Sequence, residues 1–138
     1  MKKPRILVVE SARAYQNVLR ELGAQVGAEC VFVDQLDTAL VRAEIEEFDL
    51  FVAATYLPDG EGVELARACR TSPRHSSVPI LLITSDDPAA LAEQVIPMGV
   101  TELVKRTDLP TLRRQFAECA ARWSAAADAR VLVLASTN

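Results

Sequence analysis

One stretch near the middle of the chain, residues 48–62, limits the folds that this sequence can adopt. It reads FDLFVAATYLPDGEG, in which five consecutive apolar residues (50–54) are soon followed by a Pro-Asp-Gly turn. A short apolar run that ends in a turn is typical of a strand buried on both faces, as in the middle of a parallel sheet. Open α/β sheets place their chemistry beyond the carboxyl ends of such strands, so the polar residues after this run are candidates for a functional site.

The rest of the chain alternates strand-like and helix-like patterns. Four more apolar runs are predicted to be strands, at residues 5–10, 30–33, 80–84 and from 102 to 105 or 106. Apolar residues recur at helical spacing between these runs. In the last helix they are Leu112, Phe116, Cys119, Ala120 and Trp123. Five strands that alternate with helices predict a parallel sheet with helices on both faces and right-handed crossovers.

Capping residues indicate where the helices begin. Ser11 follows the first strand and is expected to cap the first helix, and either Asp34 or Asp37 can cap the second. The second helix is expected to turn Ile45 inward together with its other apolar residues. Residues 85–88 (SDDP) predict the start of the fourth helix, because proline suits the first helical turn.

Composition excludes several classes of protein. The 138 residues are 50% hydrophobic and 25% charged with a net charge of -4, which fits one ordinary globular domain. No apolar run approaches the roughly 20 residues that span a bilayer, and the first residues lack a signal-peptide cleavage site. The scattered arginines form no basic stripe. We therefore expect a cytoplasmic protein that binds neither membranes nor, through this domain, nucleic acid.

Few residues are suited to catalysis or to metal binding. The cysteines, Cys30, Cys69 and Cys119, are odd in number and widely separated, which argues against a disulfide framework or a zinc site. The one histidine, His75, lies in a turn-rich loop, and no Ser-His-Asp or Cys-His set can be built around it. No glycine-rich phosphate loop follows the first strand. The sequence therefore predicts neither an enzyme nor a bound cofactor.

The central stretch also resembles the third strand and following loop of bacterial response-regulator receiver (CheY-like) domains. In that family an Asp-Leu pair opens the strand, a phosphoacceptor aspartate ends it, and Met-Pro and Asp-Gly pairs follow. The corresponding pairs here are Asp49-Leu50, Leu57-Pro58 and Glu61-Gly62. Counting back from Pro58 places Ala54 at the phosphoacceptor position, where a methyl group cannot accept a phosphoryl group. The resemblance covers residues 4 to about 124 and implies a flavodoxin-like (βα)5 fold with strand order 2-1-3-4-5.

The resemblance also implies where the remaining receiver site residues lie. Glu10 and Ser11 occupy the positions of the acidic pair that helps to bind Mg²⁺, so only one carboxylate of that pair is present. With Ala54, two of the three metal carboxylates are missing, and we expect Mg²⁺ binding to be lost. Thr84 matches the hydroxyl that senses the phosphoryl group.

The basic residue that contacts the phosphoryl oxygens in receivers has two candidates. Counting forward along the chain points to Arg106, whereas counting back from the last helix points to Lys105. A cation in this crevice needs a counter-charge, and the obvious one is Glu10. We therefore expect Glu10 to contact Lys105 or Arg106.

The end of the chain resembles its beginning. Residues 130–136 read RVLVLAS, close to RILVVES at residues 5–11, about one receiver domain earlier. We interpret residues 1–127 as a receiver-like domain and residues 128–138 as a linker with the first strand of a second, tandem receiver. The alternative is that the apolar tail matches by chance.

These observations favour a receiver-like module of a two-component phosphorelay that is not phosphorylated and acts by protein contacts. Its partners are expected to be other domains of the same protein or a second copy. They would bind the face formed by the fourth helix, fifth strand and fifth helix. The polar rim of that face would consist of Glu93, Gln94, Arg113, Arg114 and Arg122. The alternatives are phosphorylation of Thr55 or Ser11, and a flavodoxin-like module that binds a small ligand in the strand-end crevice.

Overall fold

The computed structural model describes residues 3–136, and it describes side chains for residues 3–126. A single sheet of five parallel strands lies at its centre, in the order β2-β1-β3-β6-β7. The strands are β1 (Arg5–Val9), β2 (Glu29–Val33), β3 (Leu50–Ala54), β6 (Ile80–Thr84) and β7 (Glu102–Lys105). This is the predicted flavodoxin-like order, since β6 and β7 are the fourth and fifth strands of the parallel sheet.

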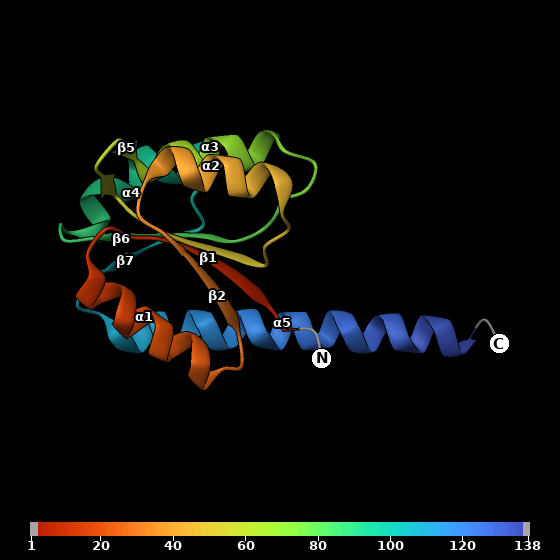
Figure 1. Cartoon of the computed structure of the whole chain (residues 1–138). Coiled ribbons are helices and arrows are strands. Elements are labelled where there is room, and N and C mark those ends of the chain that lie inside the picture. Colours follow the sequence, from red (N-terminus) through yellow and green to blue (C-terminus); the bar gives the residue numbers. More distant parts are fainter. Residues whose placement is uncertain (1–2, 137–138) are drawn as a thin grey trace.

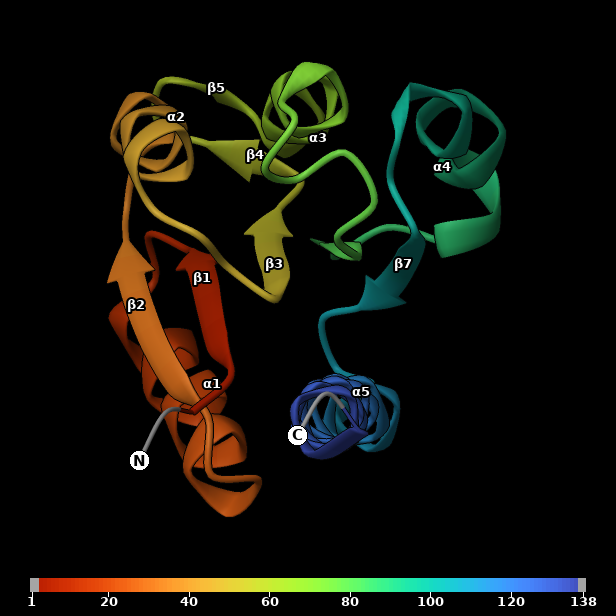
Figure 2. The ribbon, with the colours of Figure 1, turned by 90° about the vertical axis from the view of Figure 1, so that its right-hand side faces the viewer.

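Helices cover both faces of the sheet, so that the domain has three layers (Figures 1 and 2). On one face lie α1 (Arg13–Gln25) and α5 (Leu109–Ser136). On the other lie α2 (Leu36–Ile45), α3 (Gly62–Thr71) and α4 (Pro88–Val95), followed by the 3-10 turn η1 (Ile96–Met98). Among the helices of the described part of the chain, none is both long and apolar enough to span a membrane.

The central strand β3 has all five residues buried. Because side chains alternate along a strand, they divide between two apolar clusters. Leu50 and Val52 belong to the cluster with α1 and α5, whereas Phe51 and Ala53 belong to the cluster with α2 and α3. Each large apolar side chain buried in this way favours folding by about 1.5–3 kcal/mol. The continuous apolar run in the sequence is therefore explained by helices on both sides.

The loop after β3 contains a feature that the sequence did not predict. Two short antiparallel strands, β4 (Tyr56–Leu57) and β5 (Gly60–Glu61), form a small hairpin. Asp59 in its turn accepts hydrogen bonds from the backbone N–H groups of Leu36 (2.7 Å) and Asp37 (3.0 Å). The prediction that Asp34 or Asp37 caps α2 is therefore wrong, because an aspartate more than twenty residues away occupies the end of this helix.

Two other local predictions are also wrong. The side chain of Ser11 does not cap α1, which begins after Ala12 without a side-chain cap. Ile45 is 65% exposed rather than turned inward. It lies two residues beyond the buried Ala43, which places it on the opposite side of the helix.

The last helix extends further than predicted. The apolar face of its first half is confirmed, since Leu112, Phe116 and Cys119 are buried. Its backbone then stays helical to Ser136 and extends past the sheet (Figure 1). Residues 130–136 are therefore not a strand in this chain. The physical reason is that alanines dominate residues 125–129 and favour helix strongly, while a lone strand would leave its backbone groups unpaired. Whether a second receiver follows stays a prediction.

Candidate functional site

The candidate site lies at the carboxyl ends of the parallel strands. Ala54, the last residue of β3, is 6% exposed and pairs with Ile83 of β6. A pocket of about 280 Å³ opens here and is lined by Ala54, Thr55, Tyr56, Ile83, Ser85, Asp86 and Arg106. The loop after β3 returns tightly to this point, because a Cβ at Gly62 would lie only 2.3 Å from the carbonyl oxygen of Ala54. Only glycine fits where α3 begins.

Glu10 is the buried carboxylate of the site. It directly follows β1 and is 3% exposed. Its Oε2 accepts a hydrogen bond from the backbone N–H of Ala12 at 2.7 Å. Its Oε1 lies 2.6 Å from Nη2 of Arg106 in an ion pair. Within the described residues, Oε2 is therefore hydrogen-bonded, whereas Oε1 has the ion pair with Arg106 but no hydrogen bond.

The structure distinguishes between the two basic candidates. In the sheet register Thr84 pairs with Lys105, whose side chain is exposed. The backbone N–H of Arg106 donates to the carbonyl oxygen of Thr84 at 2.8 Å. This connection places the Arg106 side chain beside Glu10. The predicted contact between Glu10 and a basic residue is confirmed, and Arg106 makes it.

Sequence reasoning missed Tyr15, on α1, as a member of this site. Its hydroxyl donates a hydrogen bond to the carbonyl oxygen of Arg106 at 2.8 Å. The guanidinium carbon of Arg106 lies 4.0 Å from the centre of the Tyr15 ring, a cation–π contact. Burial raises the pKa of Tyr15 to about 12, opposed by Arg106 and reinforced by the charge of Glu10. The available signal was its position on the first helical turn after Glu10.

The hydroxyl groups near the site are bonded to the backbone or exposed. Thr84 is 1% exposed, and its Oγ1 accepts a hydrogen bond from the backbone N–H of Asp86 at 3.0 Å. Thr55 donates from Oγ1 to the carbonyl oxygen of Ile83 at 2.8 Å. Ser11 is exposed. Among the described residues, none of these hydroxyls is hydrogen-bonded to the Glu10 carboxylate.

The donor set at this site does not fit Mg²⁺. This ion requires octahedral oxygen ligands and is usually held by one or two protein carboxylates. Of the three positions at which the resemblance expects a carboxylate, only Glu10 has one, and Arg106 already balances its charge. Across the described residues, no group of three or more His, Cys, Asp or Glu side chains could hold a metal ion.

A parallel sheet in this order, with a polar crevice beyond its central strands, defines a flavodoxin-like α/β domain. The family model for the response regulator receiver domain matches residues 6–117. The chain therefore belongs to the response regulator receiver family, as the sequence pattern indicated.

Known proteins similar to this chain include sensors and chemotaxis regulators. The sensor protein GacS of Pseudomonas syringae pv. syringae is 26% identical over 126 residues, which are 89% of this chain but 14% of GacS. The chemotaxis protein CheY of Pseudomonas aeruginosa is 32% identical over 96 residues, which are 67% of this chain and 73% of CheY.

Solved structures show the same fold. One is the receiver domain of the sensor histidine kinase PA1611 from Pseudomonas aeruginosa, which has a magnesium ion coordinated in its active site cleft. It is 21% identical to this chain with a TM-score of 0.71, and the match covers 85% of this chain and 99% of that one.

Proposed function

We propose that this receiver domain does not accept a phosphoryl group and that it signals in a two-component system by contact with other proteins or domains. The observation that carries the proposal is the methyl group of Ala54 at the end of β3. The family transfers a phosphoryl group to a carboxylate at this position, and no bond to phosphorus can form at a methyl group.

The state of Glu10 supports the same conclusion. Phosphoryl transfer depends on a metal ion that offsets the negative charge on the transferring oxygens. Here the guanidinium of Arg106 lies 2.6 Å from Glu10 and supplies the positive charge. A buried carboxylate without a partner is costly, so this ion pair balances the crevice when neither Mg²⁺ nor phosphate is bound. We infer that Mg²⁺ binding is lost and that the domain has no enzymatic activity of its own.

The working surface in this proposal is the face of α4, β7 and α5. Leu109, the first residue of α5, is an exposed apolar side chain (36%), and the turn η1 that directly follows α4 adds Ile96 (43%) and Met98 (40%). Arg114 lies between Glu102 (3.6 Å) and Glu118 (3.7 Å) in exposed ion pairs. Apolar residues with a charged rim suit a protein partner, which would be another domain of the same protein or a second copy. The proposal places the domain in the cytoplasm and assigns it neither nucleic acid nor membrane as a partner.

The position of this domain in a longer protein is part of the proposal. The chain spans 14% of the length of GacS, which is consistent with receivers occurring inside larger proteins. We infer a tandem arrangement in which residues 128–138 link this domain to a second receiver. The support comes from sequence alone: residues 130–136 resemble residues 5–11, although they form part of α5 in this structure and not a strand. The test is the sequence after Asn138 in the full-length protein, which should continue with the acidic and apolar pattern of another receiver.

Acetyl phosphate tests the central claim. The purified domain is incubated with acetyl phosphate and Mg²⁺, and its intact mass is measured. We expect no gain in mass, whereas a receiver with an acceptor aspartate gains one phosphoryl group. A stoichiometric gain would contradict the proposal, and mapping it to Thr55 or Ser11 would establish the alternative acceptor. A tightly bound small molecule in the native mass spectrum would favour a ligand-binding crevice.

A further inference from the structure

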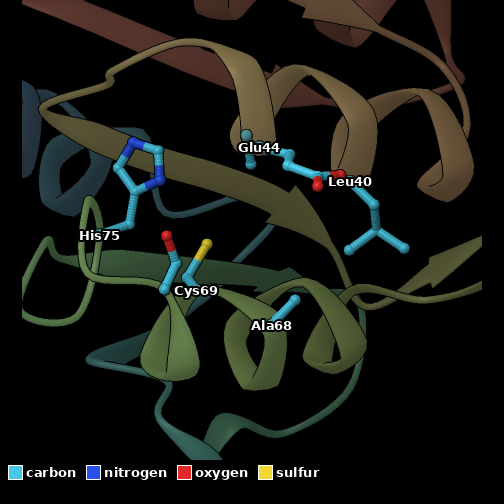
Figure 3. Close-up of a pocket in the computed structure, with 7 residues that line it drawn as sticks. Leu40, Glu44, Ala68, Cys69 and His75 are labelled. Atoms are coloured by element: carbon cyan, nitrogen blue, oxygen red, sulfur yellow. The ribbon is translucent and has the colours of Figure 1, made fainter.

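A second pocket, of about 240 Å³, lies between α2 and α3 and shares no residue with the strand-end site (Figure 3). Its walls come from one side of each helix and from the loop that follows α3. They are formed by Leu40, Ala43, Glu44, Ala68, Cys69, Ser72 and His75. The proposed function makes no use of this pocket.

His75 gives the pocket a polar group that lacks a partner. The residue is 1% exposed, and its ring packs edge-on against Phe51 with centroids 4.8 Å apart. Its Nε2 accepts a hydrogen bond from the backbone N–H of Phe48 at 3.0 Å. In a neutral imidazole whose Nε2 accepts, the proton resides on Nδ1. Within the described residues, Nδ1 has no hydrogen-bond partner.

The direction of this N–H group indicates that it could donate a hydrogen bond to a molecule in the pocket. Figure 3 shows one ring nitrogen directed toward the backbone before β3 and the other toward the space between α2 and α3. Buried donors are nearly always bonded to protein, water or ligand, because an unmet one costs about 1–3 kcal/mol. An acceptor placed in the pocket would remove that cost.

The lining defines the chemistry of such a molecule. Four lining residues are apolar or behave so, namely Leu40, Ala43, Ala68 and Cys69. Burial raises the pKa of the Cys69 thiol to about 11, so it is uncharged at neutral pH. Glu44 is exposed, so water screens its charge toward a cation, and no Lys or Arg is among the residues that line the pocket to pair with an anion. An uncharged molecule is therefore favoured. An apolar cavity of about 150 Å³ is enough to bind benzene, so this pocket suits one ring with a short substituent.

We propose that the pocket between α2 and α3 binds a small, uncharged, mainly apolar molecule whose carbonyl or ether oxygen accepts a hydrogen bond from Nδ1–H of His75. Such binding gives the domain an input other than phosphate, at a site on the α2 and α3 side of the sheet. It goes beyond the proposed function, because the pocket would bind this ligand whether or not Ala54 prevents phosphorylation.

The test uses two probes of nearly the same shape, acetophenone and cumene, of which only acetophenone has an acceptor oxygen. Each is titrated into the isotope-labelled chain and followed by NMR. We expect saturable shifts at Cys69, Ser72 and the His75 Nδ1–H with acetophenone. Cumene should bind about fivefold or more weakly, the effect of one net hydrogen bond. Equal affinity for both probes, or no saturable shift with acetophenone, would overturn the proposal.

A pocket-filling variant provides the matched control. Ala68 is exposed on α3, so Ala68→Leu extends a side chain into the pocket without disturbing the core. This variant should lose the acetophenone shifts. Ala117→Leu makes the same change at an exposed position on α5 and should retain them. Shifts that persist in Ala68→Leu would show that the probe binds elsewhere. If a water molecule bound to Nδ1 of His75 stays in place when acetophenone is added, the proposed hydrogen bond does not form and the proposal is also wrong.

Discussion

Nη2 of Arg106 lies 2.6 Å from Oε1 of Glu10, and the carboxylate side of this pair is 3% exposed. The two residues are far apart in the sequence. They meet because β1 and β7 are parallel, so that their carboxyl ends lie on the same side of the sheet. Tyr15 holds the arginine from the other side through its ring and hydroxyl. The charge of Glu10 in the crevice is therefore balanced by another side chain of the protein, Arg106.

Removing the side chain of Arg106 should destabilise the fold, because it leaves the buried carboxylate of Glu10 without its counter-charge. We expect Arg106→Ala to lower the free energy of unfolding by about 3 kcal/mol, because Glu10 would stay buried with one backbone N–H as its remaining partner. Urea denaturation measures this change. Lys105→Ala, at the neighbouring exposed residue, is the control and should change stability by less than about 0.5 kcal/mol. Equal effects of the two substitutions would show that the ion pair contributes nothing.

Introducing carboxylates at positions 11 and 54 should allow the domain to bind Mg²⁺ and to accept a phosphoryl group. In the double variant Ser11→Asp, Ala54→Asp, three carboxylates would face the crevice, including Glu10, and we expect weak Mg²⁺ binding and a gain of one phosphoryl group from acetyl phosphate. Intact mass and hydroxylamine sensitivity detect the acyl phosphate. The control is Ser11→Asp, Ala54→Asn, which has nearly the same shape without a phosphoacceptor. If the aspartate double variant stays unmodified while folded, features other than the missing carboxylates block the reaction.

The fold could be predicted from sequence because its signals are local. Each of the five parallel strands appears as a short apolar run, and β3 is buried on both faces as its pattern predicted. The contacts that could not be predicted join distant segments. One is the contact of Asp59 with the first residues of α2, and another is the contact of Tyr15 with Arg106. Neither contact corresponds to a repeating pattern in the sequence. The choice between Lys105 and Arg106 likewise depended on the register of β6 with β7.

The helix cap supplied by Asp59 can be tested through stability. We expect Asp59→Ala to lower the urea midpoint, because two backbone N–H groups of α2 lose their acceptor. Asp59→Asn keeps an acceptor oxygen and should have a smaller effect. Asp34→Ala, also exposed and near the same helix end, is the control. A midpoint for Asp59→Ala that equals that of Asp34→Ala would refute the remote cap.

The same contact has a defined pH dependence. Hydrogen bonds from the backbone N–H groups of Asp37 and then Leu36 lower the pKa of Asp59 from its usual 3.8. A depressed carboxyl pKa stabilises the fold above the usual value, and this contribution is lost as the pH falls through the folded-state pKa. The stability difference between wild type and Asp59→Asn should therefore shrink at acidic pH.

Arg70 should stabilise the segments around the beginning of β6 and β7. Its Nε donates to the carbonyl oxygen of Gly99 at 2.9 Å, and its Nη1 donates to that of Val78 at 2.8 Å and to that of His75 at 3.1 Å. We expect Arg70→Ala to cost about 2 kcal/mol of stability. Hydrogen exchange at residues 75–78 and 99–101 should accelerate. Arg67→Ala, exposed on the same helix, should do neither.

The single histidine permits a clean pH prediction, because no other side chain ordinarily titrates between pH 5 and 8. Burial, followed by the charge of Arg74, lowers the pKa of His75 from 6.5, opposed by Glu47 and Asp49. Below pH 6.5 the unfolded chain therefore binds a proton at His75 more readily than the folded chain does. The free energy of unfolding should be highest above pH 6.5 and should decrease as the pH falls below it. Urea unfolding between pH 5.5 and 7.5, with an NMR titration of the imidazole, measures both quantities. A flat stability profile, or an imidazole pKa at or above 6.5, would contradict the neutral, buried state of His75.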